Sequence, residues 1–365
     1  MGLDNVCVPD SCSRPHHTDT FAVKRERERS NASCTGETGG AVEERLRGRG
    51  ALDVASEPII VIGTPAAPIH ARETIAVRPY AKVADYWALT KPEINFLIAV
   101  ATFTGFYLGL PTRYHTFPYS LLTHTLCGTL LVASGTGTLN QYMERRFDAQ
   151  MRRTARRPLA AGRIEPLSAL WFGIVLSAAG AIYLAVAVNV LASALAVLTL
   201  TSYLFVYTPL KRKTPLCTAV GALPGAMPPL IGWAAATGRL SFEALILCAV
   251  LYLWQFPHFM AIAWMYREDY DRAGYFVLPR GQARDGLVGL QTVLPLLALF
   301  PVTLLPARAG QPSVLCCTGA LLLTLGFFYC GSHFIAHRSR TNARWLLMAS
   351  IVYLPLLFVL LVSCG

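Results

Sequence analysis

Long apolar stretches that lack acidic and basic side chains recur along the chain from Ile94 onward. Each is long enough to cross a hydrocarbon layer of about 30 Å as a helix. A charged side chain at the centre of a spanning helix costs about 2.5–3.5 kcal/mol, so its absence supports membrane insertion. We expect nine spans, at residues 94–110, 119–139, 167–188, 190–207, 216–236, 244–266, 287–305, 313–335 and 345–363. The pattern predicts an all-α, polytopic membrane helical bundle of about nine transmembrane helices.

The first 82 residues differ from this pattern. They are rich in Ser, Gly, Pro, Arg and Glu, and they show no sustained apolar period. Such a composition buries too little apolar surface to offset the entropy of folding. We therefore expect a polar, disordered N-terminal tail at 1–82 and a membrane domain at 83–365.

Composition excludes several other classes of protein. Apolar residues make up 54% of the chain and charged residues 15%, and the mean hydropathy is +0.44. A disordered chain needs lower hydrophobicity, a coiled coil needs more charge, and a secreted disulfide scaffold needs denser cysteine. The composition agrees with a membrane protein.

The net charge of +11 lies in residues 83–365, because the tail contains equal numbers of acidic and basic residues. The distribution of this charge among the loops predicts the orientation of the bundle. The loops after the second, fourth, sixth and eighth spans hold seventeen Lys and Arg. The loops after the first, fifth and seventh spans hold three. Because Lys and Arg are retained in cytoplasmic loops, we expect a cytoplasmic N-terminus and an external C-terminus.

A polar oxygen recurs every four residues at the cytoplasmic end of the second span, at Asn140, Glu144 and Asp148. A continued helix places all three on one face. Carboxylates at a helix C-terminus repel each other and face the negative end of the dipole, so a cation stabilises them. Mg²⁺ suits such oxygens and typically adds phosphate oxygens. The alternative for this motif is an ordinary solvated loop.

A second acidic cluster, Glu268, Asp269 and Asp271, follows the sixth span and emerges on the same side of the membrane. Two carboxylate groups that meet across a bundle can hold metal ions against a diphosphate. They would then neutralise the charge that develops when the diphosphate leaves. The two clusters together predict a metal-dependent diphosphate site.

Basic residues lie between these clusters. Arg153 and Arg157 stand four residues apart on one predicted helical face, and guanidinium groups bind phosphate oxygens bidentately. Arg152 and Arg156 are better explained as positive charges that fix the orientation of the membrane segment. Lys211, in the next cytoplasmic loop, either anchors the protein or binds phosphate, and the residues leave this open.

Several strings carry a family resemblance over residues 85–363: Leu89–Pro92, Asn140–Leu159, Tyr207–Arg212, Gly221–Gly238, Trp254–Phe259 and Tyr266–Gly274. In these strings the chain resembles the UbiA-type membrane prenyltransferases, and within them the haem-farnesylating branch, the protohaem IX farnesyltransferases or haem O synthases. The resemblance implies that farnesyl diphosphate ionises on Mg²⁺. Its farnesyl group then joins a vinyl group of haem B, diphosphate is released, and water completes haem O.

The resemblance assigns roles to individual residues. Catalysis and metal binding fall to Asn140, Glu144, Asp148 and Asp269; diphosphate binding falls to Lys91, Arg153, Arg157 and Lys211; and haem binding falls to His258. Two positions depart from the branch. Arg146 stands where Asp is frequent, which removes a possible metal ligand, and Cys217 stands where Asn is common.

His258 favours haem as the acceptor. It lies eleven residues before Asp269, which is about 16 Å of helix and near the middle of the membrane. An imidazole at that depth is costly without a partner, and an axial bond to haem iron would explain it. The alternative is a histidine bonded to a neighbouring helix near Pro257. Likewise, Gly221 and Gly232 allow close approach either to a flat macrocycle or to another helix.

The expected partners are farnesyl diphosphate, haem B and the lipid bilayer, with no nucleic acid, and haem-handling or oxidase-assembly proteins are further candidates. The expected location is the bacterial plasma (inner) membrane. One rival function is a UbiA-type prenyltransferase for another aromatic or tetrapyrrole acceptor, and the Trp254–Phe259 string argues against it. Another is a transporter, but transporter sites usually lie at the midplane, whereas these acids lie at the rim.

Overall fold

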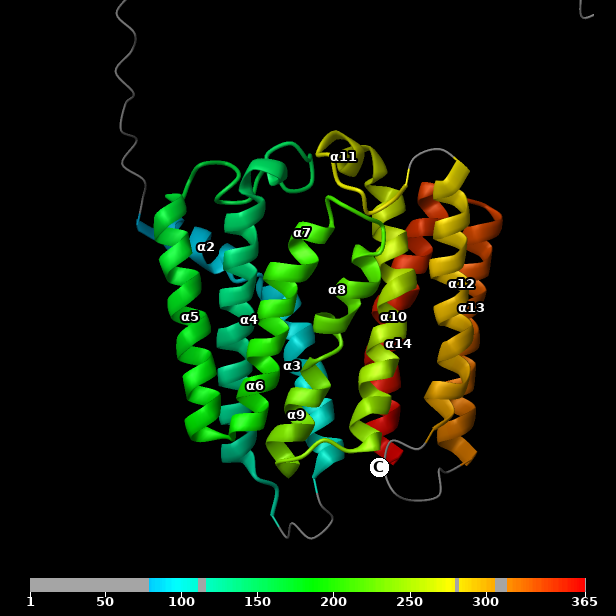
Figure 1. Cartoon of the computed structure of the whole chain (residues 1–365). Coiled ribbons are helices and arrows are strands. Elements are labelled where there is room, and N and C mark those ends of the chain that lie inside the picture. Colours follow the sequence, from blue (N-terminus) through cyan, green and yellow to red (C-terminus); the bar gives the residue numbers. More distant parts are fainter. Residues whose placement is uncertain (1–78, 111–115, 280–281, 306–313, 365) are drawn as a thin grey trace, which may run out of the picture. The chain divides into compact units, whose positions relative to one another are not determined.

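The structure is a computed structural model that describes residues 79–110, 116–279, 282–305 and 314–364. The regular elements in these ranges are helices, and the long ones lie side by side with roughly parallel axes (Figure 1). In chain order they are α2 (Pro79–Leu89), α3 (Pro92–Gly109), α4 (Tyr119–Asp148), α5 (Pro166–Ala187), α6 (Val190–Thr201), the π-helix η1 (Ser202–Tyr207), α7 (Thr208–Leu210), α8 (Cys217–Gly225), α9 (Pro228–Thr237), α10 (Phe242–Met265), α11 (Arg267–Arg272), α12 (Gln282–Leu304), α13 (Val314–Ala336) and α14 (Arg340–Cys364). The all-α prediction is confirmed. Residues 1–78 lie outside the described ranges, so the division of the chain at residue 82 stays a prediction.

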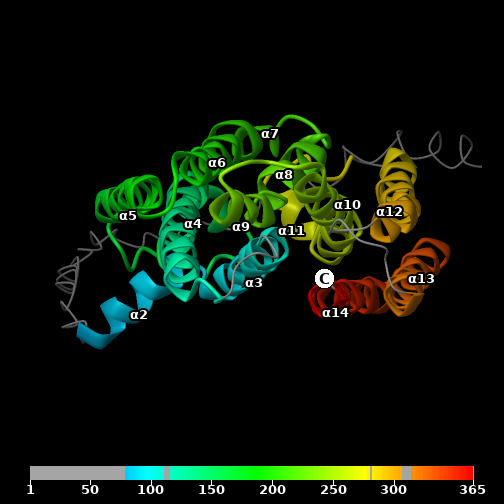
Figure 2. The same cartoon turned by 90° about the horizontal axis from the view of Figure 1, so that it is seen from below.

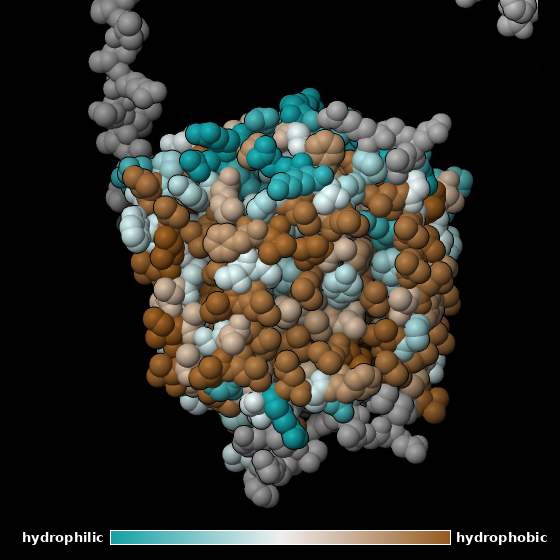
Figure 3. All heavy atoms as spheres, in the orientation of Figure 1, coloured by the Kyte–Doolittle hydropathy of each residue, from teal (hydrophilic) through white to brown (hydrophobic). Residues whose placement is uncertain are grey.

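Seven helical segments in the described ranges are long and apolar enough to cross a membrane. The other two expected spans correspond to α3 and α4, which lie among these seven in Figure 1. The threonine, serine, glycine and histidine residues within α4 lower its hydropathy, and its last turns carry the acidic motif. Apolar side chains cover most of the surface between two more polar ends (Figure 3), as expected for an integral, multi-pass membrane protein.

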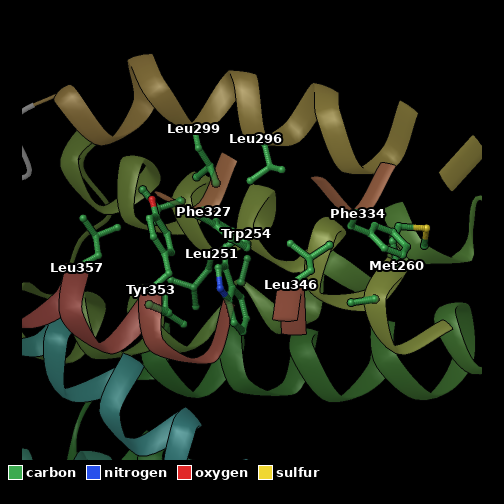
Figure 4. Close-up of a cluster of buried hydrophobic side chains, with 14 of the residues drawn as sticks. Leu251, Trp254, Met260, Leu296, Leu299, Phe327, Phe334, Leu346, Tyr353 and Leu357 are labelled. Atoms are coloured by element: carbon green, nitrogen blue, oxygen red, sulfur yellow. The ribbon is translucent and has the colours of Figure 1, made fainter. Parts of the chain in front are cut away.

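The interior contains two main apolar cores. Seen along the helix axes, α3 to α9 lie on one side and α12 to α14 on the other, with α10 between them (Figure 2). One core includes Phe106, Leu184 and Trp233, and the other joins α10 to α12, α13 and α14 (Figure 4). Because α10 contributes to both cores, it holds the two halves of the bundle together.

Close helix crossings explain two of the glycines in the predicted fifth span. A Cβ atom on Gly232 would collide with the carbonyl of Thr102 on α3, and one on Gly221 would collide with the ring of Tyr207. Of the two interpretations open for these glycines, the structure supports close approach to another helix, because protein atoms already occupy the space.

The predicted fourth span is irregular at its C-terminal end. There α6 continues as the π-helix η1 and then as the short α7, which contains Pro209. Proline has no backbone N–H to donate, and π-helical turns relieve such interruptions. The Thr208 hydroxyl donates to the carbonyl of Tyr203 (2.9 Å). This turn positions Thr208 and Lys211 beside the acidic end of α4.

Candidate active site

The first acidic motif forms one face of the last turns of α4. Asn140, Glu144 and Asp148 are 1%, 6% and 1% exposed, and the helix continues to Asp148 as their spacing predicts. The Asn140 amide donates to Glu144 Oε2 (3.0 Å) and to Thr208 Oγ1 (3.3 Å). The motif is thus a buried polar face of the bundle, and the alternative of a solvated loop is wrong.

Three of the four cations that we expect to bind diphosphate contact this motif, one on each member. A buried carboxylate without a counter-charge is strongly destabilising, so these contacts allow the motif to be buried. The pairs are Lys91 Nζ with Asn140 Oδ1 at 2.9 Å, Lys211 Nζ with Glu144 Oε1 at 2.9 Å, and Arg157 Nη1 with Asp148 Oδ2 at 2.7 Å. The three cations come from three separate segments of the chain, so the pairs also join those segments.

The Glu144 and Lys211 pair remains ionised near neutral pH. Burial alone would raise the pKa of Glu144, but the charge of Lys211 and its hydrogen bond hold that pKa below the usual value. Burial also opposes the charged form of Lys211, yet the carboxylate of Glu144 raises the Lys211 pKa well above its ordinary value. The pair is therefore a permanent charged contact inside the site.

Lys91 differs from Lys211 in both charge state and backbone. Burial, followed by the positive charge of Arg157, lowers the pKa of Lys91 to about 7. Its φ of 55° is the one left-handed value at a non-glycine residue in the described ranges. Pro92 disfavours a helical conformation at the preceding residue, and the left-handed conformation costs about 1–3 kcal/mol. From this position the Lys91 side chain donates to Asn140.

One carboxylate oxygen of the motif lacks a partner. Asp148 Oδ1 is buried and accepts no hydrogen bond from the described residues. Such an oxygen costs about 1–3 kcal/mol, which a cation would recover. No group of three acidic, His or Cys side chains within the described ranges is arranged to hold a metal. The oxygens present fit Mg²⁺, which takes few protein carboxylates and completes its coordination with phosphate and water.

The second acidic cluster is more open. Of its three acids only Asp269 is buried, and Asp269 Oδ1 accepts a hydrogen bond from Arg272 (3.3 Å). The Glu268 side chain is 60% exposed, and Asp271 pairs with Arg284 (3.0 Å). The cluster lies on α11, at the same end of the bundle as the C-terminus of α4 (Figure 1). Asp269 is therefore the one buried acid of this cluster.

The segment after α11 contacts the first motif directly. The Tyr275 hydroxyl donates to Glu144 Oε1 (3.2 Å), and the backbone N–H of Phe276 donates to the Lys211 carbonyl (2.8 Å). Burial and the neighbouring Glu144 charge raise the pKa of Tyr275, so the phenol keeps its proton. The Tyr275 ring also packs against Met151. These contacts connect the two acidic segments at one end of the bundle.

A cavity of about 260 Å³ lies between the same segments. Its lining brings together two predicted site residues, Arg153 and Asp269, and adds Arg340 from the start of α14. The remaining lining residues are Arg152, Tyr266 and Glu268. The Arg153 guanidinium lies over the Tyr266 ring, 5.2 Å from its centroid, and is exposed. Arg153 is thus the one predicted diphosphate ligand that makes no contact with the first motif in the described ranges.

His258 lies away from these acids, within α10. Its Nδ1 is 2.8 Å from Ser350 Oγ on α14, and its ring stacks on Trp254. The alternative that this histidine bonds to a neighbouring helix is therefore correct for one ring nitrogen. This bond uses Nδ1, and the other ring nitrogen, Nε2, stays available for a different partner.

Three buried polar residues escaped the reasoning from sequence: Gln141, Thr208 and Tyr275. Gln141 is adjacent to Asn140, and its amide donates to the Leu89 carbonyl (3.1 Å) before Lys91. A glutamine at the end of an apolar span was a usable signal for it. Tyr275 had no such signal, because its partner Glu144 is 131 residues away in the sequence.

The fold and this site define an intramembrane prenyltransferase, with a buried acidic motif and cations at one end of a helical bundle. The profile of the UbiA prenyltransferase family matches residues 98–362, and the chain belongs to this family. Among solved structures, a digeranylgeranylglyceryl phosphate synthase superposes with a TM-score of 0.62 at 15% identity, covering 78% of this chain and 98% of its own. A UbiA homolog from Archaeoglobus fulgidus bound to GPP and Mg²⁺ superposes with a TM-score of 0.52 at 15% identity, covering 76% and 99%. At 15% identity, these two superpositions show a shared fold and nothing more specific.

Closer relatives carry a more particular name. The protoheme IX farnesyltransferase of Solibacter usitatus is 48% identical over 283 residues, which is 76% of this chain and 97% of that protein. The mitochondrial protoheme IX farnesyltransferase of Arabidopsis thaliana is 39% identical, over 74% of this chain and 62% of that protein.

Proposed function

We propose that this protein transfers the farnesyl group of farnesyl diphosphate to a vinyl group of haem B. The observation that carries the proposal is the 48% identity to a protoheme IX farnesyltransferase over 97% of that protein's length. In the reaction the allylic C–O bond breaks and diphosphate leaves with the electron pair. The farnesyl carbon bonds to the terminal vinyl carbon, water adds to the resulting cation, and a proton is released to give haem O.

Asn140, Glu144, Asp148 and Asp269 would hold Mg²⁺. The ion would supply positive charge to the departing diphosphate. The unpaired Asp148 Oδ1 and the buried oxygens beside it support this assignment. Relatives of the same fold are described as bound to prenyl diphosphates and Mg²⁺, which agrees with it.

Lys91, Arg153, Arg157 and Lys211 would bind the diphosphate. Arg157 and Lys211 pair with the carboxylates of the first motif and Lys91 donates to its amide, so all three are within reach of phosphate oxygens that come to the same motif. Their positive charges are pre-positioned where negative charge develops on the leaving group, which lowers the reorganisation needed in the transition state. Arg153 is already exposed to the neighbouring cavity.

The acceptor would bind beside α10, with His258 offering a nitrogen to the haem iron. Seventeen basic residues in the loops at the site end against three at the other end support a cytoplasmic site, a cytoplasmic N-terminus and an external C-terminus. We place the protein in the bacterial plasma membrane, with haem-handling or oxidase-assembly proteins as further partners.

The test is direct. Membranes that contain the protein are incubated with haem B, farnesyl diphosphate and Mg²⁺, and the products are identified by mass spectrometry. Haem O is expected. If no haem O forms while a hydroxybenzoate, naphthoate or chlorophyll precursor is prenylated, the protein is a UbiA-type enzyme for that other acceptor.

A further inference from the structure

The His258 side chain is held by two contacts that both lead to Ser350. Its ring stacks on Trp254, with centroids 4.8 Å apart and an angle of 26° between the planes. Its Nδ1 lies 2.8 Å from Ser350 Oγ, and Trp254 Nε1 donates to the Ser350 carbonyl (2.8 Å). The imidazole therefore has a fixed plane and a fixed rotation within that plane.

The contacts of the Ser350 hydroxyl favour one tautomer of His258. A hydroxyl has one hydrogen to donate, and Ser350 Oγ gives it to the Leu347 carbonyl at 2.6 Å. Ser350 is 0% exposed, so its oxygen meets His258 as an acceptor within the protein. The Nδ1 of His258 must then be the donor, because two lone pairs would otherwise face each other at 2.8 Å.

A neutral imidazole that is protonated at Nδ1 has a lone pair at Nε2. No hydrogen bond to His258 Nε2 comes from any described residue, and His258 is partly exposed although Ser350 and Trp254 are buried. Metal-binding histidines show this arrangement, in which one nitrogen donates to an oxygen and fixes the tautomer, while the other faces the metal.

We propose that Ser350 is a positioning residue for the acceptor: it holds His258 with Nδ1 protonated, so that Nε2 is presented to the iron of haem B. The proposal rests on the proposed function for the identity of the acceptor. Trp254 helps Ser350 in this role, because it fixes the plane of the His258 ring and bonds α10 to the backbone of Ser350. A bond between neighbouring helices and a role as iron ligand are therefore compatible in His258.

The first measurement needs no haem. The full chain with ¹⁵N-labelled histidine rings is placed in lipid, and the ¹⁵N resonances report the tautomer; His258 is assigned by its loss in His258→Gln. Nδ1 is expected to be protonated in the parent protein. In Ser350→Ala the two tautomers are expected to mix, and Ser350→Thr, which keeps the hydroxyl, should restore the parent spectrum. A parent protein with Nε2 protonated would overturn the proposal, even if the variants do not fold.

The second measurement is binding of haem B, compared with binding of iron-free protoporphyrin IX, to the same proteins. Ser350→Ala should weaken haem binding about 10–100-fold and alter the optical and EPR spectra of the ferric iron. It should leave protoporphyrin binding unchanged, because that macrocycle has no iron to ligate. Ser177→Ala is the matched control, since Ser177 is a buried serine of α5 without a hydrogen-bond partner in the described ranges.

If Ser350→Ala weakens the binding of haem B and of protoporphyrin IX equally, Ser350 has only a structural role. If the iron spectra are unchanged in Ser350→Ala and His258→Ala, His258 does not ligate the iron. Either result overturns the proposal. Neither depends on turnover. If haem O is not formed but the iron spectra change as expected, the proposed reaction fails while the role of Ser350 stands.

Discussion

The two acidic motifs use the same residue types at the same end of the bundle, but their surroundings differ. The first lies on the 30-residue helix α4, and its acids pair with Lys211, 67 residues from Glu144, and with Arg157, nine residues from Asp148. The second lies on the six-residue helix α11, where Asp269 pairs with Arg272 three residues away. The first motif is thus a preorganised part of the tertiary structure, and the second is a local element that can adjust when a ligand binds.

The largest expected effect comes from removing the charges of the first motif. Glu144→Gln with Asp148→Asn keeps the side-chain shapes but removes two carboxylates that we assign to Mg²⁺. Haem O formation should fall roughly 1,000-fold, and chelation of Mg²⁺ in the parent should abolish it until Mg²⁺ is restored. The control is Glu165→Gln, an exposed acid at the start of α5. A double variant with parental activity would contradict the site.

The next prediction compares the cations. Lys211→Met leaves Glu144 buried without its counter-charge, so the free energy of unfolding should fall by about 3 kcal/mol. Arg272→Met breaks a local pair in which the arginine side chain is 45% exposed, and the loss should be less than about 1 kcal/mol. Equilibrium unfolding in mixed micelles measures both. Equal losses would show that the two motifs do not differ as described.

A smaller effect is expected at the connection between the motifs. Tyr275→Phe removes a hydrogen bond to the charged Glu144, worth about 1.5 kcal/mol. We expect a loss of this size in the transition-state complex, which corresponds to roughly a tenfold lower kcat/KM for farnesyl diphosphate. Tyr252→Phe is the matched control, because the Tyr252 ring packs edge-to-face on Phe256 while its hydroxyl makes no hydrogen bond among the described residues. A Tyr275→Phe enzyme that behaves like this control would show that the contact does not support catalysis.

The smallest effect is expected at Glu268. Its side chain is 60% exposed and its nearest cation, Arg267, is 3.9 Å away. Such surface pairs contribute about 0–1 kcal/mol, so Glu268→Gln should change steady-state haem O formation less than about twofold. A much larger loss would make Glu268 a ligand and would show that α11 rearranges on binding.

Much of this architecture could be predicted from the sequence. Uninterrupted apolar segments predicted the helices, and the four-residue spacing of Asn140, Glu144 and Asp148 predicted their common face, because both signals are local. Lys91, Arg157 and Lys211 were expected near phosphate, but nothing in the sequence pairs each one with a particular member of the motif. The hydroxyls of Tyr275 and Thr208 were not expected at all.

The sequence by itself determined that this protein is a helical membrane protein with acidic groups at one rim, because hydropathy and helical period depend only on neighbouring residues. Tertiary structure decided which charges neutralise each other, which single acid of α11 is buried, and which nitrogen of His258 meets Ser350 on another helix. These outcomes depend on contacts between residues far apart in the chain. Their free energies come from burial and geometry, which exist only once the helices have packed.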